Sequence, residues 1–167
     1  MSFIGDVLLD ICDPPVRAIH VYNSNPLAVA PDANRVRAGF ARDDLFCVVH
    51  EQFQTDTADY ADILLPATSQ LEHRDVHRAY GHVCAVDNRP AIAPLGEARS
   101  NTAVFRALAE RLGFMEAALH DSDDAIAAAA FNRADPRAAG LAEGLQAQGW
   151  ARLALPRPFV PFAHGGF

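Results

Sequence analysis

Three short apolar runs, separated by two segments of helical character, constrain the fold of this chain more than any other feature. The runs are Val16 to Tyr22, Leu45 to Val49 and Ile63 to Leu65. Strands that are apolar along their whole length are typical of parallel sheets covered by helices. Strand and helix alternating over about fifty residues predict an α/β fold with a doubly wound, mainly parallel sheet and helices on both faces.

The segments between and after these runs carry helix signals. Asp32 is a residue type that caps helices, and it precedes Val36 and Phe40, which are one turn apart, so the sequence predicts a helix through about Phe40. A short helical segment is expected from Thr57 to Ala61. Residues 66–94 have the character of a long polar loop, with short strands near 83–86. A helix capped by Ser100 is expected through Leu112.

The C-terminal third is rich in alanine and then in proline. Two Ala-rich helices are predicted over 121–131 and 136–146, followed by an irregular tail. The predicted division is an α/β dinucleotide-binding domain over 1–115, a helical extension over 116–150 and an irregular linker over 151–167. We also expect the apolar first residues and the tail to pack poorly, because neither has an obvious partner within the chain.

Composition excludes several classes of protein. Half of the 167 residues are hydrophobic, which excludes wholesale disorder, and the net charge of −7 disfavours nucleic-acid binding. No apolar stretch approaches the length of a membrane span, and the N-terminus does not have the pattern of a signal peptide. The three cysteines form no CxxC pair, so no zinc or iron–sulfur ligand set is expected. A cytoplasmic location is expected.

Polar segments follow all three predicted strands. They are Asn23 to Pro26, His50 to Thr55, and the chain from Pro66 onward. In open α/β sheets ligands bind beyond the carboxyl ends of the strands, and an acidic residue such as Glu51 can hold a ribose there. The G-x-G-x-x-G and P-loop motifs are absent, which disfavours a free-standing dehydrogenase or P-loop enzyme.

Three other kinds of site can be proposed from these residue types, but the sequence pattern supports them less well. The spacing of His73, His77 and His82 invites a zinc site, but the segment lacks a helical period and an H-E-x-x-H motif. A catalytic triad from Ser24 or Ser69 lacks the G-x-S-x-G motif. A hydrolase that uses Glu72 and these histidines would require a bound metal. No catalytic residue and no metal ligand is predicted in this chain.

The polar segments also carry a family resemblance. The chain resembles the molybdopterin oxidoreductases of the dimethyl-sulfoxide-reductase type, which include formate dehydrogenases and nitrate reductases. The resemblance extends from about Gly5 to Phe114. It is strongest in the Asn-Pro turn, the Thr-x-Thr-Ala to Leu-Pro-Ala string, the Leu-Glu-His triplet and the Gly-Glu-Ala-Arg-Ser-Asn stretch that opens a helix. These motifs occupy 23–26, 55–67, 71–73 and 96–101.

The resemblance implies a set of contacts to a molybdopterin guanine dinucleotide. Glu51 stands where the family more often has Asp, and Asn101 stands at a helix start that is often Asp. The cofactor-binding residues implied in this way are Asn25, His50, Glu51, Thr55, His73 and Asn101.

The resemblance further implies that this chain is part of a longer molybdenum-dependent oxidoreductase. That enzyme would carry a molybdenum bis(molybdopterin guanine dinucleotide). The resemblance is also compatible with a 4Fe–4S cluster bound by an upstream part of the enzyme and with an electron-transfer subunit as partner. Alone, this chain is expected to be inactive. The rival hypothesis is a free-standing, non-catalytic binding or assembly module of the same fold.

Overall fold

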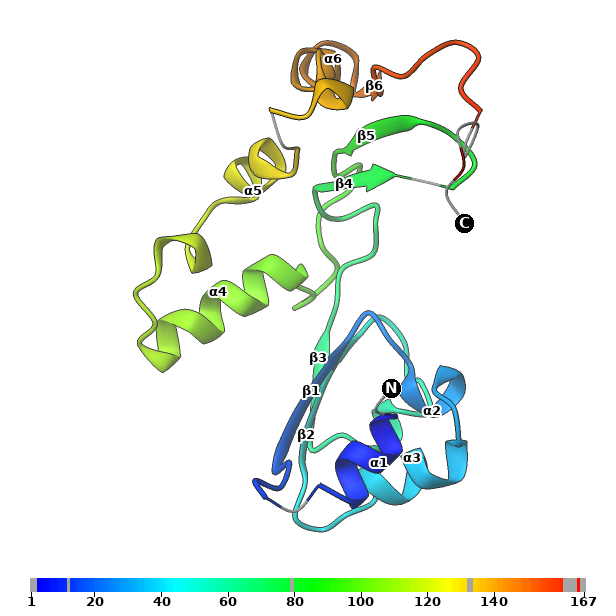
Figure 1. The fold of residues 1–167 in the computed structure, drawn as a ribbon. Helices are drawn as coiled ribbons and strands as arrows, with labels where there is room; N and C mark the ends of the chain where they lie inside the picture. Colours follow the sequence, from blue (N-terminus) through cyan, green and yellow to red (C-terminus); the bar gives the residue numbers. More distant parts are fainter. Residues whose placement is uncertain (1–2, 12, 79, 132–133, 161–164, 166–167) are drawn as a thin grey trace. The chain divides into compact units, whose positions relative to one another are not determined.

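The computed structural model describes residues 3–11, 13–78, 80–131, 134–160 and 165 (Figure 1). The contacts of the chain form two compact units. The first contains Met1–Ser69 and Pro94–Leu108, and the second contains Gln70–Ala93 and Ala109–Phe167. This grouping differs from the boundaries expected near 115 and 150, which remain a prediction about domains. The second unit combines separate parts of the chain because a strand near residue 86 pairs with a strand near residue 151.

The first unit is built on a parallel sheet of three strands in the order β1-β2-β3 (Figure 1). The strands are β1 Ala18–Tyr22, β2 Phe46–Glu51 and β3 Ile63–Pro66. Tyr22 pairs with His50, and His50 pairs with Leu65, so the three strands end at the same edge. The predicted parallel arrangement of the three apolar runs is confirmed.

Helices α1 Ile4–Leu9 and α3 Ala33–Phe40 cover one face of this sheet. The side chain of Asp32 accepts a hydrogen bond from the backbone N–H of Arg35, which confirms the predicted cap. The two helices approach closely, since a Cβ on Gly39 would lie 2.7 Å from the Cβ of Leu8. The core consists of buried side chains from both layers: Leu8, Val21, Leu27, Val36, Phe40, Leu45, Cys47, Val49 and Ala58. The expectation that the first residues pack poorly is therefore wrong for Leu8.

The first unit also contains two short helices and the start of a long one. They are α2 Pro26–Val29, the 3₁₀ helix η1 Ala58–Tyr60, and α4 Asn101–Leu112, which crosses from the first unit into the second. Phe105 of α4 packs against His20 and Tyr22, on the face of β1 opposite the core. Helices therefore contact both faces of the sheet, as predicted. Coverage is incomplete, because Phe46, Ile63 and Leu64 remain nearly half exposed.

The second unit contains an antiparallel sheet where the sequence predicted mostly loop. Its strands are β4 Asp75–Arg78, β5 Cys84–Asn88 and β6 Trp150–Arg152, in the order β4-β5-β6. The predicted short strand near 83–86 is confirmed, and the loop expected over 66–94 is wrong at β4. The prediction missed β4 because a four-residue strand with one apolar side chain, Val76, has too little alternation to be recognised.

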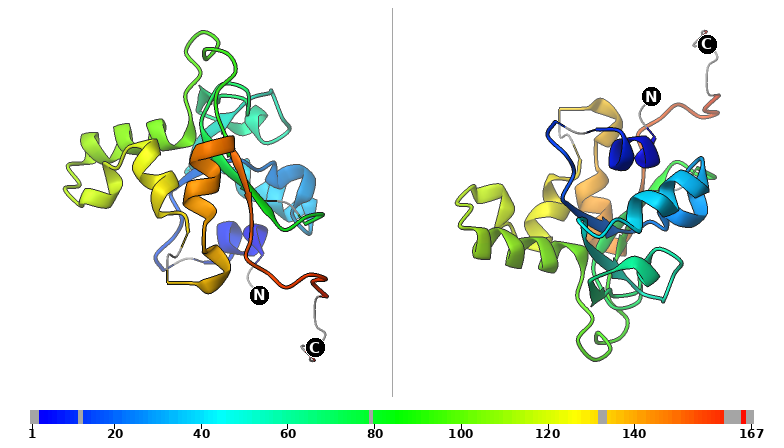
Figure 2. Two further views of the ribbon diagram at one scale, coloured as in Figure 1. Left: turned by 90° about the horizontal axis from the view of Figure 1, so that it is seen from above. Right: turned by 90° about the horizontal axis from the view of Figure 1, so that it is seen from below.

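Helices of the second unit follow α4 along the chain. They are η2 Ala117–Leu119, α5 Asp123–Ala129, η3 Pro136–Ala138 and α6 Leu141–Gln148. The helix expected over 136–146 is thus divided at Gly140, whose φ is 75°. Helix α6 packs on β5 and β6 (Figure 2). Leu141 and Leu145 of α6 are buried in the core of this unit.

The C-terminal tail is only partly as predicted. Residues 150–152 form β6, which corrects the irregular structure expected from 151, and residues 153–160 contain no helix or strand. Residues 161–164, 166 and 167 lie outside the described residues. Among the described helices none combines the length and the apolar character that crossing a bilayer would require.

Candidate functional site

The carboxyl edge of the parallel sheet gathers segments that are far apart in the sequence. Beyond β3, Ala67 forms a bridge with Arg99, the N–H of Arg99 donates to the carbonyl of Pro66, and the N–H of Thr68 donates to the carbonyl of Arg99. Arg99 lies two residues before Asn101. These bonds therefore bring the N-terminus of α4 to the edge at which β1 and β2 also end.

Asn101 contacts the loop that follows β1. Its Nδ2 donates to Oδ1 of Asn23 over 3.1 Å, although 78 residues separate the two. Asn23 has a φ of 51°, a left-handed conformation that Asn adopts more readily than most residues. The hydroxyl of Ser100 accepts from the N–H of Ala103 and caps the helix. The Asn101 side chain is thus held at a capped helix N-terminus, beside the turn after β1.

Asn25 is held by the loop that follows β2. Its Oδ1 accepts a 2.7 Å hydrogen bond from the hydroxyl of Thr57, and that hydroxyl accepts from the N–H of Leu27. Within the described part of the chain, the Nδ2 of Asn25 has no protein partner. The hydroxyl of Thr55 accepts a hydrogen bond from the N–H of Ala58, the first residue of η1. Asn25 therefore has a fixed amide with one end available to a ligand.

Glu51 is the last residue of β2 and is half-buried. Its Oε1 accepts a 2.7 Å hydrogen bond from the N–H of Gln52, which leaves Oε2 without a partner among the described residues. Gln52 in turn donates from Nε2 to the carbonyl of Thr68. The carboxylate is oriented by its own neighbour and retains an oxygen that can accept a further hydrogen bond.

His50 lies at the same edge but points into the protein. Its ring is only 1% exposed, and Nε2 lies 3.1 Å from the carbonyl oxygen of Arg99. A carbonyl can only accept, so Nε2 carries the hydrogen and donates it. Nδ1 is buried with no partner among the described residues. The resemblance implied a direct cofactor contact for His50, whereas its ring here supports the segment before α4.

His20 accompanies His50 on the α4 side of the sheet. The ring of His20 lies 6.5 Å from that of His50 and 5.4 Å from that of Phe105. Burial, and then the neighbouring His50, lower the pKa of His20 from its usual value. The Nε2 of His20 is buried without a partner in the described part of the chain. A charge on His20 is therefore unfavourable in the folded protein.

This arrangement predicts a loss of stability in mild acid. Because the pKa of His20 is lower in the folded state, the unfolded chain binds a proton first as the pH falls below about 6.5, and stability decreases. The carboxylates with lowered pKa values, Asp44, Asp87 and Asp135, titrate below this window. Urea titrations at about pH 7.5 and about pH 5.5 give the free energy of unfolding at each pH. The decrease in this free energy between the two pH values should be smaller for His20→Phe than for the parent. Exposed His120→Phe should behave as the parent, and an equal loss in His20→Phe would contradict the assignment.

The remaining predicted contact, His73, lies in the second unit. Its carbonyl accepts a 2.9 Å hydrogen bond from Nδ2 of Asn88. Asn25, His50, Glu51, Thr55 and Asn101 all belong to the first unit. The described residues contain no group of three or more potential ligands that could hold a metal ion.

Sequence reasoning missed three supporting residues. Thr57 lies inside the family-like string and Gln52 lies three residues before it, but neither was singled out. His20 lies within an apolar run. A polar residue in a run that is otherwise apolar was the available signal for His20.

Comparisons with known proteins agree with the family resemblance. The sequence profile described as molybdopterin oxidoreductase matches residues 8–111. YoaE of Bacillus subtilis (strain 168), described as an oxidoreductase, is 48% identical over 135 residues, covering 81% of this chain and 20% of YoaE. A protein of Staphylococcus aureus (strain USA300) that carries the name of a formate dehydrogenase is 35% identical over 112 residues, covering 62% of this chain and 10% of that protein.

A solved structure agrees with the fold. Acetylene hydratase from Pelobacter acetylenicus aligns with 95% of this chain and 21% of its own, with a TM-score of 0.65 and 24% identity. This chain spans a fifth or less of the length of the curated relatives described above. The family profile matches well over half of this chain. The chain therefore belongs to the molybdopterin oxidoreductase family.

Proposed function

We propose that this chain forms part of the binding site for one molybdopterin guanine dinucleotide in a longer molybdenum-dependent oxidoreductase. The observation that carries the proposal is the hydrogen bond between Asn101 and Asn23 at the carboxyl edge of the parallel sheet. It joins a capped helix N-terminus to the turn after β1, the kind of place where α/β sheets bind nucleotides. The family match supports the identity of the ligand.

The polar groups at this edge fit a guanine dinucleotide. A carboxylate oxygen of Glu51 can accept from ribose hydroxyls, and the Nδ2 of Asn25 can donate to sugar or phosphate oxygens. Asn101 retains Oδ1 as an acceptor for a guanine N–H, and the first turn of α4 favours a nearby phosphate. The donor and acceptor types thus match the ligand.

Other residues of the chain would orient these groups rather than touch the ligand. Thr57 holds Asn25, and His50 holds the carbonyl of Arg99 two residues before Asn101. Thr55 and His73 remain proposed contacts. When bound, the molybdenum centre would supply two-electron redox chemistry, and this chain would supply binding and orientation. A second dinucleotide, an iron–sulfur cluster and an electron-transfer partner would belong to other parts of the enzyme.

Loss of the Glu51 carboxylate tests the proposal. In protein expressed from the full reading frame that contains this chain, Glu51→Ala should weaken dinucleotide retention about 10- to 100-fold, because a charged hydrogen bond contributes roughly 1.5–3 kcal/mol. Molybdenum content and GMP released by acid hydrolysis measure retention. Glu110→Ala, an exposed change on α4, is the matched control.

Two outcomes would contradict the proposal. One is unchanged molybdenum and GMP content in Glu51→Ala and also in Asn101→Ala. The other is protein from the full reading frame that contains neither molybdenum nor GMP, which would favour a non-catalytic module of the same fold.

A further inference from the structure

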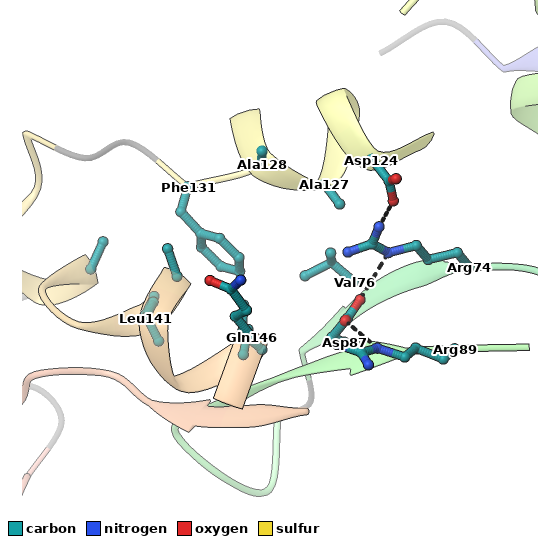
Figure 3. Close-up of a pocket in the computed structure, with 13 residues that line it drawn as sticks. Arg74, Val76, Asp87, Arg89, Asp124, Ala127, Ala128, Phe131, Leu141 and Gln146 are labelled. Carbon is teal, nitrogen blue, oxygen red and sulfur yellow. Dashed lines mark hydrogen bonds and ion pairs between the residues drawn. The ribbon is translucent and has the colours of Figure 1, made fainter. Parts of the chain in front are cut away.

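The second unit contains a pocket that takes no part in the proposed dinucleotide site. It lies between α5, α6 and the hairpin formed by β4 and β5, and its volume is about 350 Å³ (Figure 3). This volume is at the lower end of the range for small-molecule sites in proteins. One end of the pocket is charged and the other is apolar, so an occupant would need both characters.

Two arginines and one buried carboxylate form the charged end. The side chain of Asp87 is 4% exposed, and its two oxygens accept from Nε of Arg74 at 3.0 Å and from Nε of Arg89 at 2.9 Å. Burial raises the pKa of Asp87, but the bonds from Arg89 and Arg74 outweigh it and leave the pKa below its usual value. The carboxylate thus stays ionised, and the three side chains together carry one more positive charge than negative.

A surface carboxylate balances the remaining charge. Asp124, in the first turn of α5, forms an ion pair with Nη1 of Arg74 (Figure 3). Its side chain is 80% exposed, and ion pairs of such exposed groups contribute little free energy. Asp124 therefore shows that Arg74 accepts a second carboxylate, and it holds that position weakly enough to be displaced.

The opposite end of the pocket is apolar. Phe131 presents its ring to the cavity, and Ala127 and Ala128 of α5 leave space where larger side chains would fill it (Figure 3). Leu141 closes this end from α6, and the amide of Gln146 is the polar group beside it. An apolar body of one or two rings would replace water along these side chains.

We propose that this pocket binds small apolar carboxylic acids, with the ligand carboxylate on Arg74 and Arg89 in place of Asp124. The ligand carboxylate accepts hydrogen bonds from N–H groups of both guanidinium groups, and the ligand ring system lies against Phe131 and Ala127. Arg89 is more than half exposed, and its Nε bond to Asp87 is the contact it makes among the described residues. Its terminal N–H groups are therefore available.

The test uses 2-naphthoate as probe on the 167-residue chain, with 2-naphthylmethanol as the uncharged analogue and acetate as the ringless one. We expect naphthoate to bind saturably with a dissociation constant of about 1 mM or below, and the other two to bind at least roughly tenfold more weakly. Titration calorimetry measures all three.

Variants assign the binding to this pocket. Asp124→Asn removes the competing carboxylate and should tighten naphthoate binding about two- to fivefold. Glu143→Gln, which removes one negative charge from the first turn of α6 outside the pocket, should leave it unchanged. Arg89→Gln should weaken naphthoate about tenfold or more and leave naphthylmethanol unaffected. Ala127→Leu should weaken both.

The proposal is wrong if naphthylmethanol binds as tightly as naphthoate, or if Asp124→Asn and Glu143→Gln have the same effect. Arg89→Gln removes one of the two partners of buried Asp87. If that variant fails to fold, Asp124→Asn decides alone, because its side chain lies on the surface.

Discussion

Phe40→Ala should reduce the free energy of unfolding of the first unit by about 3–5 kcal/mol. The ring is 3% exposed and belongs to the core between α3 and the parallel sheet. Gly39 beside it allows α1 to approach α3 so closely that helix movement could not fill the space left by the ring. A urea titration followed by far-ultraviolet circular dichroism measures the change.

Phe53→Ala is the matched control for this prediction. Phe53 follows β2 and is 75% exposed, so the same truncation removes little buried surface and should change stability by less than about 0.5 kcal/mol. Equal effects of the two substitutions would contradict the core assignment. A larger effect of Phe53→Ala would indicate that the sheet packs in another way.

Local signals were sufficient to predict most of the first unit. The first two apolar runs became strands that lie between two layers: Val21 and Val49 face the core, and His20 faces α4. Asp32 caps α3 through a bond within four residues of chain, and such a bond can be anticipated from the sequence. These elements depend on nearby residues, so periodicity and capping identify them.

The second unit was harder to predict because its sheet depends on distant pairing. β6 is three residues long and pairs with β5 more than sixty residues earlier in the chain. Neither its length nor its pattern distinguishes it from the irregular tail, and only the partner strand makes it a strand. Buried Asp87 is likewise explained by Arg74 and Arg89, which no local motif identifies.

The candidate site shows the same limit. The ends of β1 and β2 were expected to hold ligand-binding residues, and Asn25 and Glu51 lie there. The contact between Asn101 and Asn23 depends on the bridge between Ala67 and Arg99, which cannot be inferred from either segment alone. A strand-end position indicates which edge a residue reaches, but not whether its side chain points to solvent or to the interior.

His50 provides the second large expected effect, because it is the strand-end residue that points inward. His50→Ala should lower the free energy of unfolding by about 2–4 kcal/mol, from the cavity left by a ring that is 1% exposed and from the lost bond to Arg99. His50→Gln places an N–H donor near the position of Nε2 and should recover about 1 kcal/mol. Urea titrations measure both values, with exposed His82→Ala as the control.

Hydrogen exchange shows whether His50 positions α4 through its hydrogen bond or contributes by packing alone. The bond from Nε2 to the carbonyl of Arg99 holds the segment from which α4 begins, so its loss should speed amide exchange in the first turns of α4 more than in α3. His50→Gln should restore slow exchange there, because the donor is present again. If His50→Gln exchanges as fast as His50→Ala, the hydrogen bond does not position α4, and the ring contributes by packing alone. If exchange in α4 stays at the parental rate in both variants, Asn101 is held at the carboxyl edge by the Ala67–Arg99 bridge and its own bond to Asn23, without help from His50.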